Sequence, residues 1–165
     1  MQRLRLAQVN VARLRAPLGS AAVAEFTAAL ASINRLADSM PGFVWRLPND
    51  EGHVTEAFDN LVFVNLSVWE SYQALHDFVY RSAHAGFVKR RTRWFEPMAG
   101  PTTALWWVQP GHVPSVAEAT ARLRHLQTYG PTPGAFSLRV QFAPDGRRVA
   151  SARGGPAPDK TARAR

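Results

Sequence analysis

The chain has 165 residues, of which 46% are apolar, and it contains no cysteine. This length and composition suit one globular domain with one sizeable core, and the lack of cysteine excludes disulfides, thiolate metal ligands and a cysteine nucleophile. A formal net charge of +8 raises the question of nucleic-acid binding.

Half of this positive charge lies at the C-terminus. Residues 145–165 hold six basic side chains against two aspartates, a net charge of +4, which leaves +4 for the rest of the chain. The same segment is rich in Gly, Pro and Ala and poor in large apolar residues, so burial cannot offset its ordering entropy. We therefore expect one domain over residues 1–143, a disordered basic tail over 144–165, and no nucleic-acid partner.

Hydrophobic periodicity predicts the elements of the first half. Alternation over residues 4–11 predicts a first strand, and apolar side chains at helical spacing predict a helix that begins after Ser20 and ends at Pro41. The apolar runs 43–47 and 61–68 predict two more strands, joined by a long loop.

Capping patterns predict the helices that follow. Ser67 with Glu70 resembles a capping box and predicts the start of a second helix. Ser82 predicts the cap of a further helical piece, which reaches about Trp94.

The last third of the chain continues this alternation of elements. The run 103–108 predicts a strand, Ser115 with Glu118 predicts a helix that ends at Tyr129, and alternation over 136–142 predicts a last strand. The order of elements is typical of a ferredoxin-like α+β fold, an antiparallel sheet with helices on one face.

The predicted helices suffice for only one face of this sheet. A second copy is the natural cover for the other face, so we expect a homodimer with facing sheets, a dimeric α/β-barrel. Closure of the barrel by the additional C-terminal helix and strand is the alternative.

Alternation also predicts which face binds a ligand. The aliphatic set from Val62 to Val68 suits packing on helices. The other face carries a mostly polar set, consisting of Gln8, Asn10, Phe63, Asn65 and Ser67. A buried amide without a partner costs about 1–3 kcal/mol, so these groups indicate the floor of a pocket. A structural hydrogen-bond network or a wet sheet face is the alternative.

Aromatic and titratable side chains are predicted to wall this pocket. The expected aromatic lining is Trp45, Trp69 and Trp107. We expect His84 to carry a proton, with Tyr80 beside it, because imidazole titrates near neutral pH. Ligation of a haem or metal iron by His84, or a plain capping or surface role, is the alternative.

The sequence lacks the common metal and nucleotide motifs. HxxxH, HExxH, GxGxxG, GxxxxGK[ST] and GxSxG do not occur, so we expect neither a metal site nor a dinucleotide or P-loop fold. There is also no run of about 18 apolar residues and no signal-peptide pattern, so we expect a soluble cytoplasmic protein that does not enter a membrane.

Six sequence blocks, in order, resemble a bacterial family known as domain of unknown function 3291. They are LAQVNVARL, PGFVWRL, VNLSVWESYQALHDFVYRSAH, RRTRWFEPM, ALWWVQPGH and YGPTPGAFSLR, and they span about residues 4–142. The resemblance implies membership of the dimeric α/β-barrel superfamily, which includes antibiotic-biosynthesis monooxygenases and haem-degrading oxygenases. It also implies that Asn10, Trp69 and His84 are similar in position to an Asn, a Trp and a His of the haem-degrading enzymes, with a longer spacing between Trp69 and His84 here.

Two classes of function follow from the residues and the resemblance. In the first, an apolar cavity binds a flat or hydrophobic organic molecule and performs a monooxygenase-like oxygenation or an acid–base isomerisation or cyclisation. In the second, the same cavity binds or senses its ligand without turnover. The cofactor is unknown from the sequence. We expect that the protein uses none, and haem is the alternative.

Overall fold

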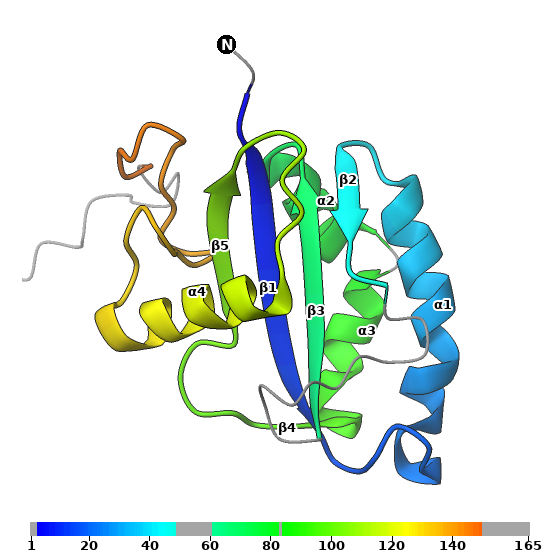
Figure 1. Ribbon diagram of the computed structural model, residues 1–165. Helices are drawn as coiled ribbons and strands as arrows, with labels where there is room; N and C mark the ends of the chain where they lie inside the picture. The colour runs from blue at the N-terminus through cyan, green and yellow to red at the C-terminus, as the bar shows by residue number, and fades with distance from the viewer. Residues whose placement is uncertain (1–2, 49–60, 83, 150–165) are drawn as a thin grey trace, which may run out of the picture.

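A five-stranded antiparallel sheet forms the centre of the protein (Figure 1). The structure is a computed structural model and describes residues 3–48, 61–82 and 84–149. The strands run in the order β2-β3-β1-β4, and β5 also pairs with β1. The N-terminal half of β1 pairs with β5, whereas its C-terminal end pairs with β4. Their bounds are β1 Arg5–Leu14, β2 Phe43–Arg46, β3 Val62–Trp69, β4 Phe95–Glu96 and β5 Thr103–Val108.

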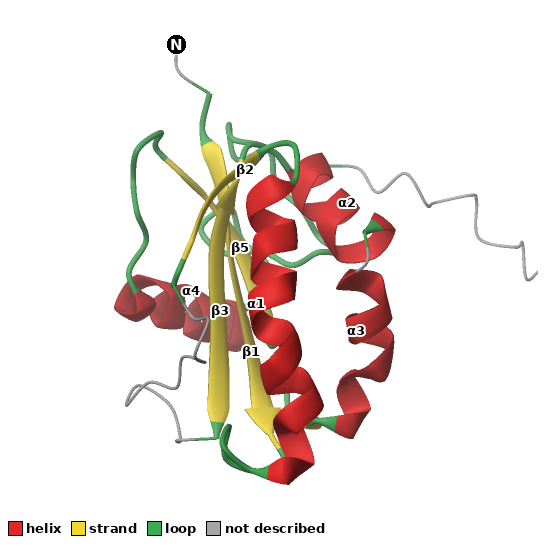
Figure 2. Ribbon diagram, turned by 90° about the vertical axis from the view of Figure 1, so that its right-hand side faces the viewer, coloured by secondary structure: helices red, strands yellow, loops and turns green. Residues whose placement is uncertain are grey.

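Helices cover both faces of this sheet. Their bounds are α1 Ala24–Ser39, α2 Tyr72–Arg81, α3 His84–Arg90 and α4 Val116–Tyr129. Figure 2 shows α1, α2 and α3 together on one face, and α4 on the opposite one. The ferredoxin-like α+β fold is thus confirmed, with α4 on the face that we expected the chain to leave bare. None of the helices in the described residues has the length and apolarity of a membrane span.

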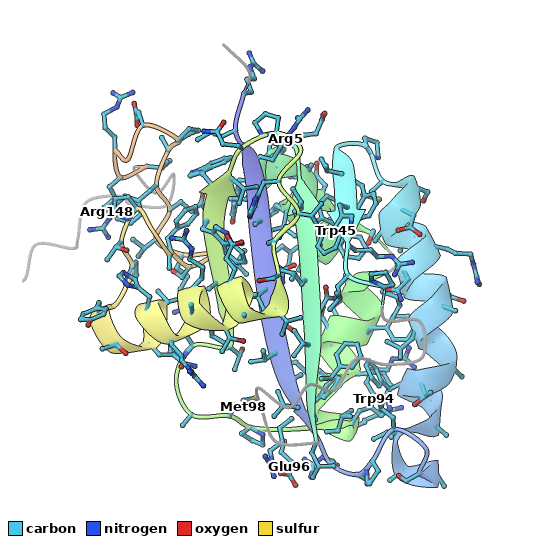
Figure 3. All side chains as sticks on the ribbon, in the orientation of Figure 1. Arg5, Trp45, Trp94, Glu96, Met98 and Arg148 are labelled. Carbon is cyan, nitrogen blue, oxygen red and sulfur yellow. The ribbon has the colours of Figure 1, made fainter. Side chains whose placement is uncertain are left out.

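The aliphatic face packs against a helix as predicted, but that helix is α4, and the helices expected on this face cover the polar face. The aliphatic set from Val62 to Val68 packs against α4, where Leu123 and Leu126 are buried. Trp45 and Met98 pack at the margin of this cluster (Figure 3). The polar face lies beneath α1 and α2 instead. Alternation shows which residues share a face, but the connections between elements decide which helix covers it.

The position of α4 bears on the expected homodimer. A second copy whose sheet faced this one would occupy the volume that α4 fills, and Val64 and Leu66 beneath it are already 0% exposed. The homodimer stays a prediction, but facing sheets would require α4 to move away.

Two of the predicted helix caps are misplaced. Ser67 is wrong as a cap, because β1 pairs with β3 as far as Trp69 and extends the strand past it. The cap is Ser71, whose side chain accepts a hydrogen bond from the Ala74 amide at 3.2 Å. Ser20 is also wrong: its side chain makes no capping bond, and a 3₁₀ turn over 21–23 precedes α1.

The other predicted helix boundaries are closer. Ser115 is confirmed as the N-cap of α4 and accepts from the Glu118 amide at 3.1 Å. The Glu118 side chain does not return to the cap but bonds Trp106 and His112, at 2.9 and 2.7 Å. Ser82 lies just ahead of α3 as the C-cap of α2.

The predicted last strand over 136–142 is wrong. Phe136 forms a single bridge to Leu105, with two backbone hydrogen bonds of 2.8 Å. The chain then turns, because the amide of Val140 bonds the side chain of Ser137. Backbone bonds continue to Val149, past the boundary expected at 143, and the remainder of the expected tail lies outside the described residues.

Gly42 lies between α1 and β2 in the chain and packs against the start of α2, at a position that requires glycine. Its φ is +80°, and its carbonyl accepts from the Glu70 amide at 2.7 Å. A Cβ at this position would lie 2.6 Å from the Cβ of Ala74 in α2. Positive φ and this close approach both exclude a side chain.

We expect Gly42→Ala to lower the free energy of unfolding by about 1–3 kcal/mol, through backbone strain and displacement of α2. Gly86→Ala is the matched control, because a Cβ there has open space in α3. This control should be neutral or stabilising by up to about 1 kcal/mol. Urea unfolding followed by tryptophan fluorescence measures both, and equal effects would contradict the role of Gly42.

Substitution of a buried side chain in α4 tests whether this helix covers the aliphatic face. Leu123→Ala should cost about 2–5 kcal/mol of unfolding free energy, whereas Arg124→Ala, on the exposed side, should stay within about 0.5 kcal/mol. Both losses should be independent of protein concentration. A concentration-dependent loss, with a dimer mass by light scattering, would show that a second copy helps to cover this face.

Candidate functional site

A small enclosed cavity lies between the sheet and α1. Its volume is about 20 Å³, which is enough for one water molecule. Its lining combines polar and apolar side chains from five elements, and consists of Gln8, Ile33, Asn34, Ala37, Arg46, Asn65, Ser67, Trp69 and Phe78. A few convergent polar groups within apolar walls are typical of ligand sites.

A directed chain of hydrogen bonds forms the floor of the cavity. The Trp69 indole Nε1 donates to Ser67 Oγ at 2.9 Å, and Ser67 Oγ donates to Gln8 Oε1 at 2.9 Å. The strand ladder creates this contact, because Gln8 and Ser67 are direct cross-strand partners. An indole N–H can only donate, so the Ser67 hydroxyl accepts from it and donates its own hydrogen bond to Gln8 Oε1. The Nε2 donors of Gln8 remain available to an occupant of the cavity.

Two asparagines extend the polar lining. Asn34 projects from α1 and is only 6% exposed. Asn65 in β3 is half-buried, and its amide makes no side-chain hydrogen bond to another residue in the described part of the chain. Because a half-buried amide is costly to leave unsatisfied, Asn65 is a second group that an occupant can bond.

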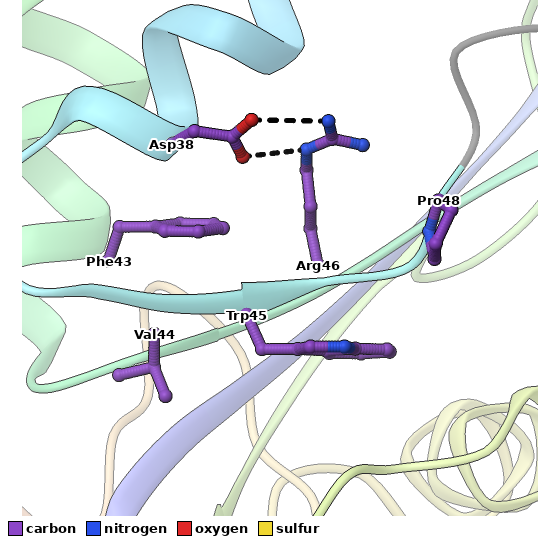
Figure 4. A pocket seen from close by; sticks show the side chains of 6 residues that line it. All are labelled: Asp38, Phe43, Val44, Trp45, Arg46 and Pro48. Atoms are coloured by element: carbon purple, nitrogen blue, oxygen red, sulfur yellow. Dashed lines mark hydrogen bonds and ion pairs between the residues drawn. The ribbon is translucent and has the colours of Figure 1, made fainter.

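An ion pair lies at the rim of the cavity. Arg46 donates through Nε to Asp38 Oδ1 at 2.8 Å and through Nη2 to Asp38 Oδ2 at 3.2 Å (Figure 4). Arg46 also lines a surface depression of about 380 Å³, together with Asp38, Phe43, Val44, Trp45 and Pro48. Arg46 is thus shared between the outer depression and the inner cavity.

Four of the predicted pocket residues meet in this cavity, namely Gln8, Asn65, Ser67 and Trp69. Asn10 lies on the same face, opposite Asn65, but its amide donates to Thr103 Oγ1 at 2.7 Å instead. Phe63 is buried in a separate apolar cluster, edge-on to Phe26 with ring centroids 5.3 Å apart.

The other two predicted aromatic lining residues lie elsewhere. A β-bulge between Phe43 and Trp45 turns Trp45 to the aliphatic face, and Figure 4 shows Trp45 on the side of β2 opposite Arg46. Trp107 faces the helices, but from β5, where its Nε1 donates to the Phe142 carbonyl at 2.8 Å. Neither contributes to the inner cavity.

Of the two predicted proton carriers, Tyr80 is not among the residues that line the cavity. Tyr80 is 49% exposed and packs on His76, with ring centroids 4.9 Å apart. It follows the cavity residue Phe78 by two positions, about 200° around the helix. His84 begins α3, but its side chain lies outside the described residues, so its role stays a prediction.

Other titratable groups near α2 offer no clear replacement. Burial raises the pKa of the Tyr72 phenol, the nearby Tyr80 raises it further, and a hydrogen bond with Gln141 lowers it. The Tyr72 hydroxyl already donates to the Leu138 carbonyl at 3.2 Å. Among the described residues that line the cavity, Arg46 is the one ionisable side chain.

No site for a metal ion or a haem is found among the residues that the structure describes. The described residues include no group of three or more His, Asp or Glu side chains arranged to hold a metal. A space of about 20 Å³ does not fit a haem, since cofactor pockets measure about 300–1,000 Å³.

Three residues of the site were not predicted from the sequence, namely Asn34, Asp38 and Arg46. A signal for Asn34 was present, because it interrupts the apolar stripe of α1 between Leu30 and Ala37, both of which are buried. Arg46 and Asp38 gave no such signal, since charged residues at a strand end and a helix end are ordinary on a surface.

The hydrogen bond between Trp69 and Ser67 should show as an energetic coupling. In a double-mutant cycle with Ser67→Ala and Trp69→Phe, we expect about 0.5–1.5 kcal/mol of coupling in unfolding free energy. A second cycle with Ser67→Ala and Trp107→Phe is the control. The Trp107 indole bonds the Phe142 carbonyl, so the coupling should stay within about 0.3 kcal/mol. A null result for the first pair would contradict the directed chain.

Several solved structures are similar to this chain at low identity. PA3566 from Pseudomonas aeruginosa has a TM-score of 0.47 and 14% identity, over 68% of this chain and 99% of that chain. SnoaB, a cofactor-independent oxygenase from Streptomyces nogalater, has a TM-score of 0.43 and 19% identity, over 68% and 99%. The ActVA-Orf6 monooxygenase of Streptomyces coelicolor, in complex with nanaomycin D, has a TM-score of 0.44 and 19% identity, over 68% and 95%.

The family comparison is more extensive. No curated protein matches the sequence. Residues 5–152 match the family described as Domain of unknown function (DUF3291), and the chain belongs to that family.

Proposed function

We propose that this protein binds a small organic molecule in the cavity beneath α1 and is an enzyme of the monooxygenase-like type. The directed chain from Trp69 through Ser67 to Gln8 is the observation that carries the proposal. Because Ser67 bonds the oxygen of the Gln8 amide, the Nε2 group of Gln8 is left without a side-chain partner among the described residues, and Gln8 lines the cavity. Preorganised donors of this kind stabilise an oxygen atom on which negative charge develops.

The lining indicates the chemistry of the ligand. Gln8 Nε2 and the Arg46 guanidinium are hydrogen-bond donors, and the Asn65 amide has both a donor and an acceptor. Donors predominate, so the bound group is an oxygen acceptor such as a carbonyl, enolate or phenolate. Ile33 and Phe78 supply apolar contact for its carbon skeleton. Because the cavity holds about one water molecule, it accepts one ligand oxygen, and the body of the ligand lies toward the outer depression.

Oxygenation suits this site better than acid–base catalysis. An acid–base reaction needs a group that titrates near neutral pH, and the described lining offers only an arginine. A phenol or enol carries its own acidic proton, and the donors of the cavity would favour its anion. Such an anion can give electrons to oxygen directly, as when a phenol and O₂ yield a quinone and water. The family resemblance noted from the sequence also implies oxygenation.

Binding without turnover is the second candidate. The same absence of a titratable group from the described lining favours it, because orientation alone requires no proton transfer. The two candidates share the binding site and differ only in whether oxygen is consumed.

A panel of naphthols distinguishes the two candidates. Binding is measured by tryptophan fluorescence, and turnover by oxygen uptake. We expect Asn65→Ala to weaken binding of the best naphthol about fivefold to tenfold, because one hydrogen bond is lost. Asn10→Ala is the matched control, since its amide is bonded to Thr103, and it should change affinity by less than about twofold.

Each outcome has a defined meaning. Oxygen uptake that falls in Asn65→Ala but not in Asn10→Ala supports the enzyme. Saturable binding without oxygen uptake supports the binding protein. If no naphthol binds, or if both variants behave as the unchanged chain does, the assignment of this cavity is wrong.

A further inference from the structure

We propose that the ion pair between Arg46 and Asp38 is a gate over the cavity, and that the ligand is an oxyanion that replaces Asp38 as the partner of Arg46. This inference rests on the proposed function and specifies its substrate class. The protein would then select anionic ligands over neutral ligands of the same shape.

The position of the pair supports a gate. Asn34 and Asp38 lie one turn apart on α1, so they share one side of that helix. Asn34 lines the inner cavity, and Asp38 lines the outer depression one turn further along. Arg46 extends from β2 to Asp38 (Figure 4). It lines both spaces, so a ligand that moved from the depression into the cavity would pass its guanidinium.

The strand ladder keeps Arg46 near the floor of the cavity. Arg46 is the cross-strand partner of Ser67, the middle member of the directed chain. The two side chains therefore project from the same face of the sheet. A ligand oxygen in the cavity lies between the donors of Gln8 and the guanidinium of Arg46, and both favour negative charge on that oxygen.

The two partners differ in exposure, which makes the pair exchangeable. The Asp38 side chain is 43% exposed, whereas that of Arg46 is 17% exposed. Water solvates the carboxylate of Asp38 well, so its release costs little, as is usual for ion pairs near a surface. A ligand oxyanion bound on the inner side meets Arg46 where water is scarcer, and the attraction there is stronger.

Charge balance provides the selectivity. In the free protein Asp38 is an ion-pair partner of Arg46, and in the complex the ligand takes the place of Asp38. A neutral ligand carries no charge that could replace Asp38, so Arg46 would remain on Asp38 and the gate would stay closed. Asp38 therefore competes with the ligand for Arg46, and Arg46 attracts the ligand.

Two probes of matched shape, 2-naphthoate and 2-naphthamide, test this inference on the full chain. Binding is followed by the indole N–H signal of Trp69 in ¹H–¹⁵N spectra, which is identified by its loss in Trp69→Phe. We expect naphthoate to bind at least about tenfold more tightly than naphthamide. Arg46→Gln should remove this preference, and Asp38→Asn should raise naphthoate affinity about twofold to fivefold without changing that of naphthamide.

Glu25→Gln is the control for net charge. Glu25 pairs with Arg90 on the surface, at 2.6 Å, so this variant removes one negative charge away from the gate. It should leave both affinities within about 1.5-fold of those of the unchanged chain. The remaining indole signals report whether each variant is folded.

The results separate this inference from the proposed function. Equal affinities for the two probes, or equal effects of Asp38→Asn and Glu25→Gln, would overturn the gate but leave the cavity as a ligand site. If neither probe moves the Trp69 signal, the ligand site is wrong and the gate with it. Loss of naphthoate binding in Arg46→Gln with naphthamide binding intact supports the gate.

Discussion

The structure depends on the position of β1 at the centre of the sheet. This strand pairs with β3 along one edge and with β4 and β5 along the other, so both its edges are hydrogen-bonded and its register is fixed from two sides. One face places Val9 and Val11 beneath α4, and the other places Gln8 beneath α1. A slip of one residue would exchange these faces and bury amides among aliphatic side chains. The core and the candidate site are therefore specified by the same register.

The polar side of this register is organised by hydrogen-bond direction. Because the Trp69 indole can only donate, the orientation of Ser67 and then of Gln8 follows from it. Because the oxygen of the Gln8 amide is bonded to Ser67, Gln8 contributes its donors to the lining of the cavity. Arg46 adds positive charge on the same side, and the oxygen ligand that we propose would meet these groups together.

Much of the fold was predictable because it follows from local patterns. Alternation located β1, apolar runs located β2, β3 and β5, helical spacing located α1, and a capping pattern located α4. Errors arose where several local signals competed. Ser67 and Ser71 both suit a cap, and only the pairing of Trp69 with β1 shows that the strand continues past the first. Likewise, Phe136 begins an alternating run, but in this run only Phe136 pairs with β5, through a single bridge to Leu105.

The sequence by itself determined the α+β class, the polar strand face and four members of the site, because side-chain alternation in a strand is a local property. Tertiary structure alone decided that α4 covers the aliphatic face and that Trp45 turns away from the cavity at a bulge. It also brought Arg46 to Asp38, across the turn between α1 and β2. These contacts depend on helix placement and strand irregularity, which periodicity does not encode.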